Sequence, residues 1–312
     1  MTQISLVSAS LAAVASELLL YGIYLALSFF YILLIFQRQR DFTGASKVLR
    51  IVSPVFIGMS GLWLVVTGHC IVSVVRLFLA VGPMEANANL FYSDFSHITE
   101  LVKYGFFTAS ICIGDVLLIH RVWAVWGFNA HIIILPILTM MGFAAFGCGF
   151  IYQLSQFTSK DSLFTGRFHM WGTGLCVFTQ CTNFYTTGFI WYKLWSTSRV
   201  VEPLGGSSLA RIIRAFLDSA GLFAAWGLFH VISYQLGSNI QFVAIDGLPA
   251  IVGLTNILIF IRLRLDFAEH STQLRGSAVT HTIVFSPDLE SGQRASEAES
   301  ESLKVLLIGP SA

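Results

Sequence analysis

The stretch LAAVASELLLYGIYLALSFFYILLIF, Leu11–Phe36, contains a single charged residue, Glu17, in a long run of apolar and aromatic side chains. About 20 apolar residues are enough for a helix to cross the hydrocarbon core of a bilayer. No Lys or Arg precedes the stretch, and it is about twice as long as the apolar part of a secretory signal peptide. We therefore predict a retained first membrane helix.

Six further stretches of the same kind follow along the chain. Of the 312 residues, 55% are hydrophobic and only 11% are charged, whereas soluble domains carry about 25% charged residues. Backbone groups in lipid must be hydrogen-bonded within the segment, so each stretch is expected to be a helix. The sequence thus predicts an all-α bundle of seven transmembrane helices. The six further spans are Ile51–Val81, Ile98–Val125, Ile132–Leu154, His169–Trp195, Ile212–Tyr234 and Ile240–Ile261.

Basic residues gather on one side of these spans, which predicts the orientation of the chain. Cytoplasmic loops carry the excess of Lys and Arg, so we expect the N-terminus outside and the C-terminus in the cytoplasm, in the plasma membrane rather than an internal membrane. Residues 1–268 are predicted to form the transmembrane domain, and 269–312 a disordered, Ser- and Glu-rich cytoplasmic tail. The eleven basic residues of the cytoplasmic side are Arg38, Arg40, Lys47, Arg50, Arg121, Lys193, Arg199, Arg211, Arg214, Arg262 and Arg264; the other side has Lys160 and Arg167.

Asp115 is the candidate site residue that lies deepest in the predicted bilayer. Ionisable groups inside a span are costly, and they usually face the bundle interior. Asn183 and Asn256 fall at a similar depth on other spans, and either could hydrogen-bond Asp115 across the bundle. A structural interhelical bond and a switch or ion-coupling role both remain open for this group.

Three more polar residues lie inside predicted spans: His69, His230 and Asp246. His69 and Asp246, together with Arg76, fall nearer the outer half, where a ligand entering from outside would be met. Interhelical hydrogen bonds are the alternative role for the two histidines. Other ionisable residues lie within about two turns of the outer boundary. We expect their long side chains to extend to the lipid headgroups. They are Glu17, Arg76, Glu100 and Lys103.

No catalytic or cofactor signature accompanies these residues. The last span contains no Lys to hold a retinal Schiff base, and the chain has no phosphate loop, dinucleotide fingerprint or nucleophile elbow. We expect no enzyme activity, no cofactor, no metal and no nucleic-acid partner. Membrane lipid is the expected surrounding, with a small or lipidic ligand and a cytoplasmic signalling protein as possible partners.

Two motifs carry a resemblance to a known group of proteins. The first is Gly114–Gly127, GDVLLIHRVWAVWG, with Ile133–Pro136, IILP; the second is Gly253–Leu263, GLTNILIFIRL. Both resemble a large family of uncharacterised seven-helix, receptor-like proteins of mushroom-forming fungi. The resemblance covers Ala15–Leu265 and implies a receptor-like fold without defining an activity.

The likeness to G-protein-coupled receptors is limited to topology. Those receptors end their third helix in an acidic-Arg-aromatic triplet, where this chain has His120-Arg121-Val122, and no Asn-Pro-x-x-Tyr sequence ends the last span. The expected function is an orphan receptor in which Arg121, Arg211 and Arg214 face cytoplasmic partners. The main alternative is a transporter or lipid-translocating protein that uses the buried Asp and His groups; a membrane enzyme ranks third.

Overall fold

The computed structural model describes residues 5–39, 54–82, 88–157, 166–201 and 207–262. Within them the chain forms helices and no strand, which confirms the predicted all-α class. Every predicted span coincides with a helix, to within a few residues at each described end. The helices are α1 (Leu6–Gln39), α3 (Pro54–Val81), α4 (Ala88–Ser93), α5 (Ile98–Val125), the 3-10 helix η2 (Ala130–Ile133), α6 (Ile134–Ser155), α7 (Gly166–Val201), α8 (Ser207–Gln235) and a last helix, Gln241–Arg262.

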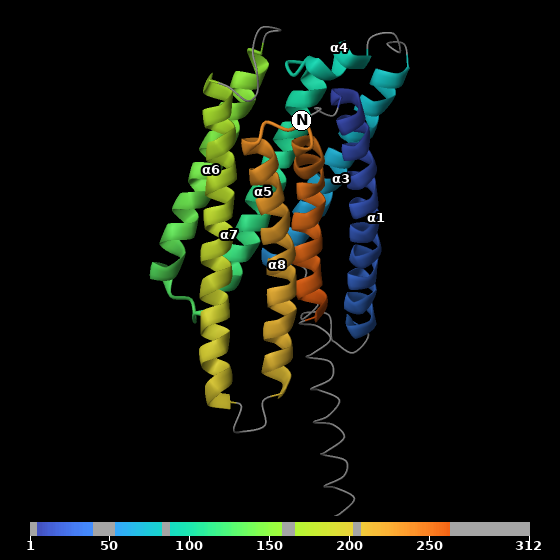
Figure 1. The fold of residues 1–312 in the computed structure, drawn as a ribbon. Coiled ribbons are helices and arrows are strands. Elements are labelled where there is room, and N and C mark those ends of the chain that lie inside the picture. The colour runs from blue at the N-terminus through green and yellow to red at the C-terminus, as the bar shows by residue number, and fades with distance from the viewer. Residues whose placement is uncertain (1–4, 40–53, 83–87, 158–165, 202–206, 263–312) are drawn as a thin grey trace, which may run out of the picture. The chain divides into compact units, whose positions relative to one another are not determined.

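The long helices stand side by side, and each runs antiparallel to the one before it in the chain (Figure 1). Helix α5 packs on α3, α6 and α7, while α7 also packs on α8, and α1 on α3 and α4. The short helix α4 lies at the end of the bundle where α1, α5 and the last helix begin (Figure 1). We call this the α4 end, and the other the opposite end.

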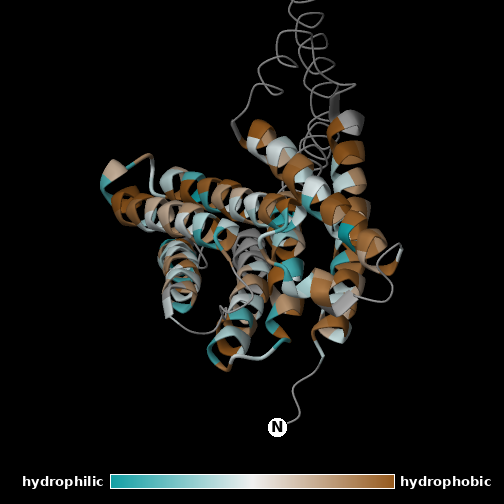
Figure 2. Ribbon diagram, turned by 90° about the horizontal axis from the view of Figure 1, so that it is seen from above, coloured by the Kyte–Doolittle hydropathy of each residue, from teal (hydrophilic) through white to brown (hydrophobic). Residues whose placement is uncertain are grey.

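The last helix is the most enclosed of the membrane-span candidates. In its most apolar stretch 89% of the residues are buried, against 17% for α1. Apolar residues recur along the long helices in the view from above (Figure 2), and many of those on α1 are exposed. An exposed apolar face on a long helix is what contact with lipid requires. The last helix is therefore a central element, and α1 a peripheral one.

Five helices in the described part of the chain are long and apolar enough to cross a membrane. They are α1, α3, α5, the α6 region (Ala130–Ser155) and the last helix. Helices α7 and α8 are longer than α6 but contain more polar residues. The protein is therefore a multi-pass membrane protein, and its crossing by all seven helices stays a prediction. The tail at 269–312 lies outside the described residues.

Candidate functional site

An ion pair joins α5 to the last helix near the α4 end. Lys103 Nζ donates to Asp246 Oδ2 over 2.7 Å. Lys103 lies five residues after Ile98, where α5 begins, and Asp246 lies five residues after Gln241, where the last helix begins. Both side chains therefore sit about 7 Å below the starts of their helices, since a helix rises about 1.5 Å per residue. The equal depth lets them meet.

A second ion pair joins α3 to α5. Arg76 Nη2 lies 2.7 Å from Glu100 Oε2, and Arg76 Nη1 donates to Thr99 Oγ1 over 2.6 Å. The same guanidinium lies 5.0 Å from the ring centre of Phe91 in α4, within cation–π range. Arg76 thus holds three elements together at the α4 end.

A third pair joins α1 to α3. His69 Nδ1 and Glu17 Oε1 lie 2.6 Å apart. Lys103 also lies within electrostatic range of Glu17 and of Glu100. The three pairs therefore form one group, the α4-end cluster, whose members are Glu17, His69, Arg76, Glu100, Lys103 and Asp246.

The prediction that four of these residues reach the headgroups is wrong. Glu17, Arg76 and Glu100 are only 2%, 3% and 5% exposed, and Lys103 is engaged by Asp246. Burial of a charge is tolerated when an opposite charge meets it with good geometry. Arg76, Glu100 and Lys103 each have a partner of opposite charge on a neighbouring helix. The partner of Glu17 is His69, which carries the opposite charge when it is protonated. From the sequence, each of these residues was assessed alone, by its depth in the bilayer. Their opposite charges at matching depths on different helices were the signal that they form pairs.

A cavity of about 20 Å³ lies beside this cluster. Its walls include four charged side chains of the cluster and three hydroxyls, those of Ser10, Ser73 and Tyr92. Within the described segments the buried hydroxyl oxygen of Tyr92 has no hydrogen-bond partner. Such a volume holds about one water molecule. The cavity therefore offers polar groups to a small polar occupant. Its charged walls are Arg76, Glu100, Lys103 and Asp246.

Toward the opposite end, Arg121 makes the second polar link between α5 and the last helix. Its Nη2 donates to Asn256 Oδ1 over 2.9 Å and to the Asn256 carbonyl oxygen over 3.3 Å. The guanidinium also lies 4.4 Å from the ring centre of Phe260. Arg121 is 8% exposed, so it is turned into the bundle in this state and does not lie on the surface expected to meet a cytoplasmic partner.

A close approach of the backbones permits this link. A Cβ atom added to Gly114 would overlap Val252 Cγ1 of the last helix. Gly therefore lets α5 and the last helix lie close together, as small residues do between membrane helices. Asn256 is held in place by donating its Nδ2 to the Val252 carbonyl oxygen over 2.8 Å.

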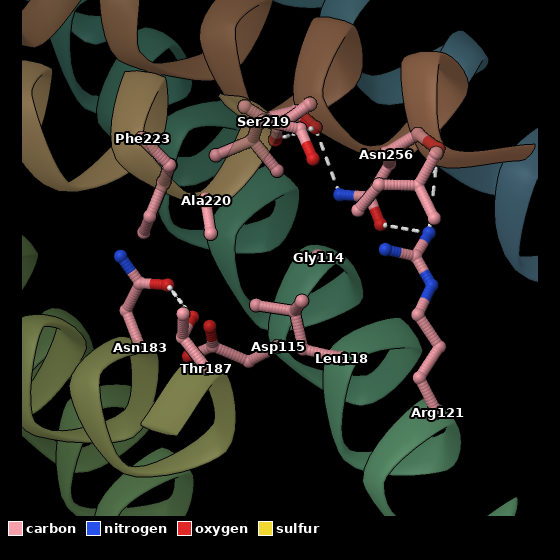
Figure 3. A pocket seen from close by; sticks show the side chains of 13 residues that line it. Gly114, Asp115, Leu118, Arg121, Asn183, Thr187, Ser219, Ala220, Phe223 and Asn256 are labelled. Carbon is pink, nitrogen blue, oxygen red and sulfur yellow. Dashed lines mark hydrogen bonds between the residues drawn. The ribbon is translucent and has the colours of Figure 1, made fainter. Parts of the chain in front are cut away.

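Asp115 lies in a second cavity of about 20 Å³ between α5, α7, α8 and the last helix (Figure 3). Its walls also include Asn183, Asn256 and Arg121. No direct bond from Asp115 to either Asn is present: Asn256 bonds Arg121, and Asn183 Oδ1 accepts from Thr187 over 3.2 Å. Asp115 Oδ2 and Asn183 Nδ2 are buried without a partner in the described part of the chain.

The six predicted polar-core residues therefore separate into three places. Asp115, Asn183 and Asn256 line the Asp115 cavity, while His69 and Asp246 belong to the α4-end cluster. His230 lies apart, with its Nδ1 3.7 Å from Cys176 Sγ and its ring tilted against that of Tyr234.

The other coupling candidates, Arg211 and Arg214, belong to the first turns of α8. Their side chains lie outside the described residues, so their predicted role stays untested. Among the described residues no group of three or more His, Cys, Asp or Glu side chains could hold a metal ion.

In comparisons with known proteins, no family model, no curated protein and no solved structure matches this chain. Its function is therefore inferred from the geometry of the two polar sites.

Proposed function

We propose that the protein is a seven-helix, receptor-like protein of the plasma membrane, with its N-terminus outside. The α4 end would then face the exterior and the opposite end the cytoplasm. A small or lipidic ligand binds within the bundle and changes its conformation, and a cytoplasmic signalling protein binds the changed state. The charge asymmetry of the chain and its multi-pass fold support this proposal.

One observation carries the proposal: α5 and the last helix are tied at two depths, and a cavity lies beside each tie. Lys103–Asp246 is the tie near the α4 end, and Arg121–Asn256 the tie toward the opposite end. A ligand shifts a conformational equilibrium only if it binds one state better than the other. A ligand group that competes for Lys103 or Asp246 weakens one tie and so favours separation of the two helices.

Separation would change what the cytoplasmic end presents. Arg121 is now buried against Asn256 and Phe260. Releasing it would expose a cation where the proposed partner binds. The two ties therefore provide the two sites and two states that allosteric signalling requires.

Two substitutions at the same tie test this proposal in opposite directions. Asn256→Ala removes the acceptor side chain and so weakens the hold on Arg121, whereas Arg121→Ala removes the cation. In a cell-based G-protein activation assay on the tagged protein, Asn256→Ala is expected to raise basal signalling, and Arg121→Ala to abolish it. Equal surface expression of both variants is the control. Identical effects of the two substitutions would refute the release of Arg121 as the signal.

A transporter is the second candidate, because Asp115 presents to a cavity a buried carboxyl oxygen that has no partner among the described residues. Intramembrane carboxyl groups of this kind serve as proton or ion carriers in transporters. In this case Asp115→Asn would abolish solute movement across the membrane of intact cells, with no G-protein activation in any variant. Normal solute movement in Asp115→Asn would count against transport.

A further inference from the structure

A ladder of rings and one cation runs along the outer face of α7 near the opposite end of the bundle. Trp191 and Trp195 are stacked, with ring centres 5.5 Å apart and planes 9° from parallel. The guanidinium of Arg199 lies 3.9 Å from the ring centre of Trp195. The three residues follow one another at intervals of four, which places them on one face of a helix. We call them the indole ladder.

A second cation lies near the ladder along α7, on a different face of the helix. Lys193 Nζ lies 5.2 Å from the ring centre of Trp126, just after α5 ends. Trp126 also stacks on Tyr192, and its Nε1 donates to the Phe189 carbonyl oxygen over 3.3 Å. These contacts fix Lys193 to the end of α5, so two cations are held within two turns of each other on α7.

In the proposed seven-helix arrangement the ladder lies at the boundary of the bilayer. Helix α7 has 36 residues, about 54 Å of helix against a hydrocarbon core of about 30 Å, so it extends beyond the core. Trp191 and Trp195 are 41% and 39% exposed. Exposed Trp side chains collect at the level of the lipid headgroups, where a ring with one polar atom is most stable.

Neither cation has a carboxylate partner among the described residues, where the ion pairs are those of the α4-end cluster. A guanidinium stacked on a ring directs its N–H groups outward in its own plane, toward an acceptor beside the ring. Phosphate oxygens suit this geometry because they accept two parallel N–H bonds. The ladder therefore combines an apolar wall for an acyl chain with a cation for a phosphate.

We propose that the indole ladder forms a binding site for the headgroup of an anionic phospholipid. The predicted orientation places the site in the cytoplasmic leaflet, which carries the anionic lipids. Arg199 binds the phosphate, and Trp191 and Trp195 pack on the upper acyl chain. The site is separate from both polar clusters, so it stands whether the protein is a receptor or a transporter.

Lipid retention measures this site directly. The full chain is reconstituted into bilayers of phosphatidylcholine and phosphatidylserine in equal parts and extracted in mild detergent; the retained lipids are then counted by mass spectrometry. The wild type is expected to retain phosphatidylserine preferentially. Arg199→Gln is expected to reduce that preference about fivefold, since each basic side chain near a bilayer contributes about that factor.

Arg199→Lys is the matched control, because it keeps the charge and should keep most of the preference. Arg199 is exposed, so its variants are expected to fold, which thermal unfolding of each checks. An equal retention of the two lipids by the wild type would overturn the proposal, as would an unchanged preference in Arg199→Gln. Displacement of the retained lipid by inorganic phosphate would identify a soluble phosphate as the occupant and also overturn it.

Discussion

Lys103 and Asp246 lie 143 residues apart in the chain and 2.7 Å apart in the structure, as an ion pair between α5 and the last helix. The pair is nearly enclosed, with side chains 12% and 5% exposed. Removing one member leaves a buried charge without compensation, which costs more than the pair itself contributes. The pair is therefore a sensitive reporter of how the two helices are held together.

The Lys103–Asp246 pair predicts a rescue by double substitution. Lys103→Met or Asp246→Leu alone is expected to destabilise the protein by about 3 to 5 kcal/mol, whereas the double variant should recover most of that loss because no unpaired charge remains. Thermal unfolding of the four proteins in detergent measures the coupling. Additive losses in the double variant would show that the two side chains do not depend on each other.

The same chemical change at two buried aspartates should have opposite effects. Asp246→Asn removes a charge that Lys103 requires, so it should lower the melting temperature. Asp115 Oδ2 has no partner in the described residues, so Asp115→Asn removes a costly group and should leave stability unchanged or raise it by about 1 to 3 kcal/mol. Strong destabilisation by Asp115→Asn would indicate an ionic partner for Asp115.

Much of the fold could be predicted from the sequence because the place of a residue within its apolar run determines its depth along the helix. Helix α5 begins and ends where its apolar run does, at Ile98 and Val125. The direction in which a side chain leaves its helix, and the helix that it meets, are not local properties. Glu17 was for this reason placed at the headgroups, whereas its partner His69 lies 52 residues away in the chain.

The site was predicted in part for the same reason. Asp115, Asn183 and Asn256 were grouped by depth, and they do line one cavity. Their hydrogen bonds were not predictable. Asn256 bonds Arg121, which lies one helical turn beyond Leu118 on α5, and does not bond Asp115. This contact is possible because Gly114 lets α5 and the last helix lie close together. Contacts that depend on helix separation need the packed structure.

Gly114 predicts a steric test of that close approach. Gly114→Ala would place a methyl group against Val252 and force the helices apart, at a cost of about 1 to 3 kcal/mol. Val252→Ala in the same chain should restore part of the loss. Gly105 is a matched control on the same helix, since a Cβ there meets no atom within 4 Å, and Gly105→Ala should be neutral or stabilising. The wild type and the three variants are compared by thermal unfolding.

The predicted orientation is tested by labelling single cysteines at opposite ends of the bundle. Ser93 ends α4, and Thr197 lies near the end of α7; both are exposed. With the N-terminus outside, a membrane-impermeant maleimide should label Ser93→Cys in intact cells, and Thr197→Cys only after permeabilisation, because the reagent reaches thiols only in water. The wild type, whose five cysteines all lie within helices, sets the background. The reverse labelling pattern would show that the protein has the opposite orientation. The α4-end cluster would then lie on the cytoplasmic side and the indole ladder in the outer leaflet.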